Sequence, residues 1–139
     1  MYMITTTTHF DGAHFLAGYD GKCRNIHGHR WGIKVTAAAE TLSGDGSDRA
    51  MVTDFSDLKK VLEGITDAFD HALIYEAGSL KETTRAALRE EGFRMCEISF
   101  RPTAECLAKH IYDRMKDAGC PVYSVEVHET PGNAAIYTE

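Results

Sequence analysis

The sequence contains few of the residues that mark a disulfide-linked, disordered or membrane-spanning protein. Its 139 residues include only 3 prolines, 1 tryptophan and 4 cysteines. No apolar run approaches the roughly 18 residues that a transmembrane helix needs, which excludes such a helix. The N-terminal residues 1–10 lack a basic segment followed by an apolar block, so we expect no signal peptide and a cytoplasmic location. The cysteines form no Cys-x-x-Cys pair, which favours reduced thiols over disulfides.

Positive charge is also scarce. Lysine and arginine total 15 against 21 acidic residues, a formal net charge of −6. This balance argues against nucleic acid or an anionic membrane as the main partner. An anionic substrate would therefore have to be bound by local basic residues. The length predicts a single domain over residues 1–139, and a composition of 43% hydrophobic and 26% charged residues is ordinary for a globular protein.

Alternation of apolar and polar residues predicts two strands near the N-terminus, over residues 3–14 and 27–40. A glycine-containing loop joins them, and a polar turn over residues 43–48 follows the second. In the second strand every other residue forms a mainly apolar face that begins with histidines: His27, His29, Trp31, Ile33, Val35, Ala37 and Ala39.

The middle of the chain changes to a helical period. Asp54 is the expected N-cap of a first helix with its apolar stripe at Phe55, Leu58, Leu62, Ile65 and Phe69. A capping-box pattern over residues 79–82 predicts a second helix that stops at Gly92, and a third helix is expected from Thr103 to Gly119. Short strands are expected over 95–100, 122–130 and 134–138. The order ββ-α-α-α-ββ predicts an α+β fold, an antiparallel sheet with helices on one face.

Histidine is the residue in surplus: there are 7, three of them between positions 14 and 29. His27 and His29 project from the same face of their strand, and antiparallel pairing would bring His14 beside them. Three imidazoles suit Zn²⁺ and leave a coordination position for water or substrate, as in catalytic zinc sites. The alternative is a half-buried strand face that binds no metal.

Cys23 lies four residues before His27, between the basic residues Lys22 and Arg24. As a fourth ligand it would close the site and favour a structural zinc, whereas a free thiol with cationic neighbours could act as a nucleophile or general base. An inert loop thiol is the third possibility. The spacing alone does not distinguish the three.

Two further groups stand out downstream. Asp70 and His71 are adjacent, and adjacent residues do not face each other on a helix. They can cooperate only where the backbone is irregular, or by acting on a group from another element; otherwise they are a solvated acid and a capping histidine. Glu129 continues the apolar face of its strand, which is out of place for a carboxylate unless it is paired or binds a ligand with donors. The alternative is a solvated carboxylate, since Glu129 lies at a strand end near Pro131.

Taken together, six ordered segments between about residues 10 and 137 resemble the 6-pyruvoyltetrahydropterin synthase superfamily. With three residues between the cysteine and His-Gly-His, the chain is most similar to the bacterial 6-carboxy-5,6,7,8-tetrahydropterin synthases of queuosine biosynthesis. Residues 77–99 are longer than in compact relatives and are expected to form an inserted helix. The segments are Phe10-Asp-Gly-Ala-His14, Cys23-Arg-Asn-Ile-His27-Gly-His29, Met51-Val-Thr-Asp54-Phe55, Asp70-His71, Pro102-Thr103-Ala-Glu105 and Glu129-Thr130.

The resemblance implies a tunnelling fold: a four-stranded antiparallel sheet with helices on one face, in subunits that assemble as a homohexamer of two trimers with active sites between chains. It also implies that zinc is bound by His14, His27 and His29. The resemblance assigns the remaining roles as follows: Cys23 as general base, Asp70 and His71 as its proton-transfer partners, Glu129 as anchor of the pterin ring, and Thr103 and Glu105 near the pterin pocket.

The reaction implied by the resemblance converts 7,8-dihydroneopterin triphosphate to 6-carboxy-5,6,7,8-tetrahydropterin, with release of acetaldehyde and triphosphate. Lys22, Arg24 and Arg30 are candidates to bind the triphosphate. Two alternatives remain: a synthase that eliminates triphosphate to give 6-pyruvoyltetrahydropterin without carbon–carbon cleavage, and a non-catalytic, zinc-stabilised pterin-binding protein. From the histidines alone, a metal-dependent hydrolase would be expected.

Overall fold

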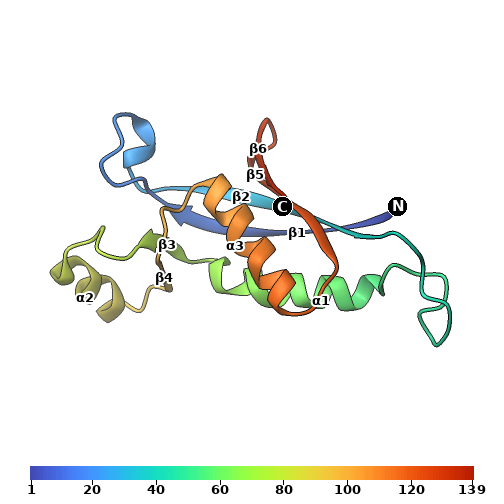
Figure 1. Ribbon diagram of the computed structural model, residues 1–139. Coiled ribbons are helices and arrows are strands. Elements are labelled where there is room, and N and C mark those ends of the chain that lie inside the picture. Colours follow the sequence, from blue (N-terminus) through green and yellow to red (C-terminus); the bar gives the residue numbers. More distant parts are fainter.

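A long antiparallel hairpin organises the computed structural model, which describes residues 1–139. Strands β1 (Tyr2–His14) and β2 (His27–Ala39) pair without interruption from Tyr2 opposite Ala39 to His14 opposite His27 (Figure 1). The alternating pattern that predicted these strands holds over their whole length. The hairpin therefore ends with two histidines directly opposite each other.

Four further strands complete a mixed sheet of six, in the order β4-β3-β1-β2-β5-β6. Strands β5 and β6 extend the hairpin by antiparallel pairing, whereas β3 is parallel to β1 and β4 is parallel to β3. The α+β class is confirmed, but the expected four-stranded antiparallel sheet is too small by these two parallel strands. The four strands added to the hairpin are β3 (Leu73–Glu76), β4 (Met95–Ile98), β5 (Val122–Thr130) and β6 (Asn133–Tyr137).

The three α-helices are α1 (Phe55–Thr66), α2 (Glu82–Glu90) and α3 (Ala104–Asp117). Helices α1 and α3 pack against the sheet and each other, through contacts with β1 and β5. Helix α2 lies at one end of the molecule near β3 and β4, where the longer segment 77–99 was expected to form a helix (Figure 1). None of these helices combines the length and apolar character required to cross a bilayer.

The N-cap residues of the three α-helices agree only in part with the sequence prediction. Asp54 caps α1 as expected and accepts the backbone N–H groups of Ser56 and Asp57. Thr103, near which the third helix was expected to start, caps α3 and accepts the N–H of Cys106. The predicted capping box of α2 is wrong: Lys81 occupies the N-cap without a side-chain bond, and Ser79 donates instead to the carbonyl of Glu76. Phe55 is also not part of the buried stripe, because it is the first residue of α1 and remains 58% exposed.

The core lies between α1, α3 and the sheet face that they cover, which we call the inward face. On β1 and β2 this face carries Phe10, Trp31, Ile33 and Val35, each at most 2% exposed. The opposite, outward face carries polar side chains such as Asp11 and Arg30. Alternation along each strand therefore determines on which side of the sheet every site residue lies.

Candidate metal centre and proton-transfer pair

His14, His27, His29 and Glu129 come together where β1, β2 and β5 adjoin. One ligand atom from each residue lies within 4.8 Å of the ligand atoms of the other three. His14 is buried, and the other three side chains are partly buried. The pairing of β1 with β2 brings the histidines together as the strand pattern predicted, and the inward position of Glu129 follows from its alternation with Val125 and Val127.

Backbone carbonyls fix the orientation of two of these rings. Nδ1 of His14 donates to the carbonyl of Pro102 and Nδ1 of His27 donates to the carbonyl of Asn25, each at 2.7 Å. In the neutral rings Nδ1 then holds the proton, and Nε2 of each presents a lone pair. Burial lowers the pKa of His14, which favours its neutral form.

The two Nε2 atoms of His14 and His27 are 3.1 Å apart. Two lone pairs that face each other at this distance repel unless a cation or proton lies between them. Two nitrogen ligands on one tetrahedral Zn²⁺ would be about 3.3 Å apart, given Zn–N bonds of about 2.0 Å. The donor set therefore fits a metal ion.

His29 supplies a second observation that fits a metal. Its Nε2 is buried without a well-directed hydrogen bond, although a Glu129 carboxylate oxygen lies 2.9 Å away. A buried polar atom without a hydrogen bond is uncommon and indicates a missing partner. Trp31 lies beneath the group, with its ring nearly perpendicular to those of His14 and His29, and is fully buried.

Cys23 lies in the loop that connects β1 to β2, in the middle of a 3-10 turn over Lys22–Arg24. Its thiol is free and its side chain is half-buried. The carbonyl of Cys23 accepts a hydrogen bond from the backbone N–H of Leu16, so two distant positions of the same loop are joined. The three other cysteines are free thiols too.

Asp70 and His71 form a contact pair at the edge of β1. His71 Nδ1 lies 3.0 Å from a carboxylate oxygen of Asp70, whose other oxygen accepts the N–H of Asp11 at 3.0 Å. His71 adopts a left-handed backbone conformation, with φ of 54°, and its own N–H donates to the carbonyl of Asp11. Adjacent residues were expected to cooperate only where the backbone is irregular, and the left-handed conformation of His71 is such an irregularity. The hydrogen bond from the Asp11 N–H lowers the pKa of Asp70 below its ordinary value, and the smaller effect of the His71 side chain acts in the same direction.

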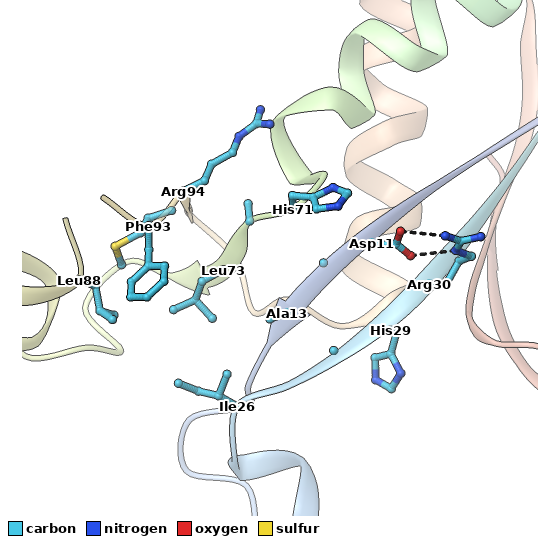
Figure 2. Close-up of a pocket in the computed structure, with 14 residues that line it drawn as sticks. Asp11, Ala13, Ile26, His29, Arg30, His71, Leu73, Leu88, Phe93 and Arg94 are labelled. Atoms are coloured by element: carbon cyan, nitrogen blue, oxygen red, sulfur yellow. Dashed lines mark hydrogen bonds and ion pairs between the residues drawn. The ribbon is translucent and has the colours of Figure 1, made fainter. Parts of the chain in front are cut away.

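The Asp70–His71 pair does not face the histidine group within one chain. The side chain of His71 is 76% exposed and lies beside a pocket of about 620 Å³. Outward residues of the hairpin, such as Ala13 and Arg30, line the same pocket, and His29 also contributes to its lining. In Figure 2 the ring of His71 lies beside β1, and that of His29 extends from β2 on the far side. The two groups thus use different sides of the sheet.

The family model described as 6-pyruvoyl tetrahydropterin synthase matches residues 3–139. The chain belongs to this family. The chain is 38% identical to the 6-carboxy-5,6,7,8-tetrahydropterin synthase of Haemophilus influenzae, over 100% of both chains. It is 33% identical to the enzyme of that name from Synechocystis, over 99% of this chain and 93% of the relative. The predictions of family membership and of an enzyme are confirmed.

Solved structures support the same fold. The 6-pyruvoyl tetrahydropterin synthase of Caenorhabditis elegans superimposes with a TM-score of 0.70 at 23% identity, over 99% of this chain and 95% of that one. An uncharacterized protein from Wolinella succinogenes superimposes with a TM-score of 0.77 at 21% identity, over 99% and 98% of the two chains. At these identities the likeness extends to the fold alone.

The family resemblance assigned other residues to the site, and the structure places them as follows. Thr103 caps α3 through its hydroxyl, and Glu105 is exposed in the first turn of that helix. Arg30 is held in a bidentate pair by Asp11, at 2.9 and 3.0 Å, on the outward face. Lys22 and Arg24 remain exposed beside Cys23.

Sequence reasoning missed two features of this 6-pyruvoyl tetrahydropterin synthase family site. Glu129 was expected beside the pterin, yet the structure also groups it with the histidines. The sequence did hold a signal for this grouping, because Glu129 shares the inward face of β5 with Val125 and Val127. Its neighbour His128 pairs with Gly32 of β2, so Glu129 lies close to the histidine end of that strand. The ring-orienting carbonyls of Asn25 and Pro102 had no signal, because every residue has a carbonyl and only the fold selects which is used.

Proposed function

We propose that the protein is a zinc-dependent lyase that converts 7,8-dihydroneopterin triphosphate to 6-carboxy-5,6,7,8-tetrahydropterin in queuosine biosynthesis. Water is consumed, and triphosphate and acetaldehyde are released. The observation that carries the proposal is the histidine group, where two backbone-oriented rings direct Nε2 atoms at each other 3.1 Å apart. Support for the substrate comes from relatives of 38% and 33% identity that bear the name of this synthase.

His14, His27 and His29 would hold the zinc. When bound, Zn²⁺ supplies Lewis-acid polarisation of a substrate hydroxyl. Three protein ligands leave a position for that hydroxyl, which is the arrangement of catalytic zinc sites. Trp31 excludes water from beneath the group, since it is fully buried there.

Glu129 is proposed as the anchor of the pterin. Its carboxylate is 28% exposed, so it can accept the two N–H groups of the guanidine-like pterin edge as well as contact His29. Glu129→Gln separates this role from metal binding. An anchor predicts a KM increase of about tenfold or more with zinc retained, because a neutral amide accepts less strongly. Loss of zinc from the variant would instead identify Glu129 as a metal ligand.

Proton transfer is assigned to Cys23, Asp70 and His71. The Cys23 thiolate would remove a side-chain proton of the substrate, and His71, held by the ionised Asp70, would relay protons. Lys22 and Arg24 flank the thiol without ion pairs to other residues, so they are better placed for the triphosphate than Arg30, which Asp11 engages. Thr103 and Glu105 are proposed to lie near the pterin.

The proposed enzyme is a homo-oligomer, a hexamer of two trimers, whose active sites combine residues of different chains. Supporting this, the exposed His71 and the inward histidine group use different sides of one sheet. A second chain could bring its Asp70–His71 pair to the Cys23 of the first. The exposed edges of β4 and β6 are also available for pairing between chains.

A complementation experiment tests the shared site. Cys23→Ala and His71→Ala, each with zinc quantified, should both be inactive as pure proteins. When equal amounts are unfolded and refolded together, about a quarter of the sites should receive both intact residues from different chains and regain activity. No recovery in the mixture would contradict a shared site, provided that the wild-type protein refolds under the same conditions.

Product analysis tests the reaction. Wild-type protein with zinc and 7,8-dihydroneopterin triphosphate should yield triphosphate, acetaldehyde and the carboxylated pterin, identified by mass. Triphosphate without acetaldehyde would instead identify a 6-pyruvoyltetrahydropterin synthase. Tight binding of the pterin without any triphosphate release would indicate a non-catalytic binding protein.

A further inference from the structure

The segment just before α3 contacts both halves of the candidate site. The carbonyl of Pro102 orients the ring of His14, as described above. The neighbouring side chain, Arg101, donates from a guanidinium N–H to the carbonyl of Ala17 at 3.1 Å. Ala17 belongs to the loop of residues 15–26, which carries Cys23 and which we call the Cys23 loop. Two adjacent residues therefore contact a candidate metal ligand and the Cys23 loop.

The Cys23 loop has few other attachments. Its remaining hydrogen bonds are local, such as those from the backbone N–H of Leu16 to Cys23 and from the Asn25 side chain to the carbonyl of Lys22. It makes no ion pair, and most of its residues are exposed. The Arg101 bond is the one hydrogen bond that joins this loop to an element distant in sequence. Without it, every hydrogen bond of the loop would be local.

Arg101 makes a second contact with the same loop. Its guanidinium carbon lies 5.8 Å from the centroid of the Tyr19 ring, within range of a cation–π interaction. The Tyr19 ring in turn covers Gly21, where an added Cβ would come within 2.6 Å of it. Gly21 immediately precedes the turn that contains Cys23. Arg101, Tyr19 and Gly21 thus form a continuous line of contact up to that turn.

We propose that Arg101 is a positioning residue that holds the Cys23 loop in a fixed relation to the histidine group without itself touching substrate. This inference rests on the proposed function, in which Cys23 is the base. Arginine suits the task because its planar guanidinium can donate in its plane while its face lies against an aromatic ring. A lysine ammonium lacks this planar geometry and can satisfy the two contacts only in part.

The test is Arg101→Ala in the zinc-loaded, full-length protein, with three readouts. Bound zinc should be unchanged, and KM should remain within about twofold. The kcat should fall about tenfold, because a misplaced catalytic group loses rate rather than binding. Alkylation of Cys23 by iodoacetamide, followed by peptide mass spectrometry, should become at least about threefold faster because the released loop opens more often. The other cysteines serve as internal references for unfolding.

Matched variants make the test specific. Tyr19→Ala removes the aromatic partner from the loop side and should reproduce both changes, whereas Tyr19→Phe keeps the ring and should behave as wild type. Arg101→Lys should restore part of the lost kcat. Arg49→Ala removes an exposed arginine from a different loop and should change nothing.

Unchanged Cys23 alkylation in both Arg101→Ala and Tyr19→Ala would overturn the proposal, whatever the activity. Faster alkylation with unchanged kcat would overturn it as well, because loop order would then have no catalytic consequence. If Cys23→Ala retained full activity, the proposed function of Cys23 would fail. The alkylation rates would still show whether Arg101 holds the loop, so the two failures remain distinguishable.

Discussion

The histidine group and the Asp70–His71 pair are both built around imidazoles, but they are organised in opposite ways. The histidine group faces inward, and two of its rings are oriented by backbone carbonyls. His71 is 76% exposed and is held beside β1 in a left-handed conformation. Such a conformation is costly for a residue other than glycine, and it persists where the surrounding structure enforces it.

Under the proposed function, this difference separates metal binding from proton transfer. In the inward group, backbone carbonyls already orient two rings so that their Nε2 atoms could bind a cation. The outward pair has its orientation fixed by the backbone of Asp11, and its imidazole is largely exposed beside a pocket. A folded monomer is thus expected to bind metal but not to complete the reaction.

The largest effect is expected from removal of an inward ligand. His29→Ala should lower zinc affinity by more than the roughly 10–100-fold typical of second-shell changes, and kcat/KM by about a thousandfold or more. His9→Ala is the matched control, since His9 lies on the outward side of β1, and it should retain zinc and activity. Zinc retention by His29→Ala would disprove the inward group as the metal site.

A smaller effect is expected from the outward pair. Asp70→Asn keeps the shape of the side chain but removes the charge that orients His71, so kcat should fall about 10- to 100-fold while zinc remains bound. The pKa of Asp70 is lowered, so the wild-type carboxylate is ionised throughout the neutral range. Loss of zinc in this variant would show that the two groups are not independent.

Two glycines of the hairpin, Gly12 and Gly28, differ in how closely other atoms approach them. A Cβ on Gly12 would lie 3.0 Å from the carbonyl oxygen of Phe69 and 3.1 Å from Ile74, whereas a Cβ on Gly28 would meet nothing closer than 3.6 Å. Gly12→Ala should lower the free energy of unfolding by about 1–3 kcal/mol, the usual range for overpacking. Gly28→Ala should change it by less than about 0.5 kcal/mol. Urea unfolding of both variants measures the difference, and equal effects would contradict the packing described.

The smallest effect concerns a histidine with no assigned site role. His110 lies near the rings of Phe69 and Phe100, and burial lowers its pKa below 6.5. The unfolded chain therefore binds the proton more readily, so stability present above pH 6.5 is lost as the pH falls through the lowered pKa. His110→Phe removes this pH-dependent loss of stability, because phenylalanine does not bind a proton. The Tm of wild type minus that of the variant should decrease from pH 7 to pH 5, and a constant difference would contradict the pKa direction.

Much of the fold followed from periodicity alone. The hairpin and helices α1 and α3 were predicted because their apolar residues recur at strand or helix spacing over many residues. Strand β3 was missed because Leu73, Ile74 and Tyr75 are consecutive apolar residues, and its four residues show no alternation. Parallel pairing also joins segments far apart in the chain, and no local signal reports it.

The site was predictable where it depends on side-chain type and strand alternation. His27 and His29 had to share a face, and antiparallel pairing supplied His14. What could not be predicted depends on tertiary contacts: the carbonyl of Pro102 reaches His14 across 88 positions of sequence. The left-handed conformation at His71 was equally hidden, because nothing in its side chain requires it.

The unbroken pairing of β1 with β2 also constrains how this sequence can change. Inserting a single residue inside β1 would shift every later side chain to the opposite face, so His14 would leave the group. An insertion in β2 after His29 would place its histidines and its later core residues on opposite faces. The Cys23 loop lies outside the paired region, so its length can vary without moving the strand-borne histidines. Insertions and deletions should therefore accumulate in that loop during evolution, allowing the thiol to be repositioned while the metal ligands stay in phase.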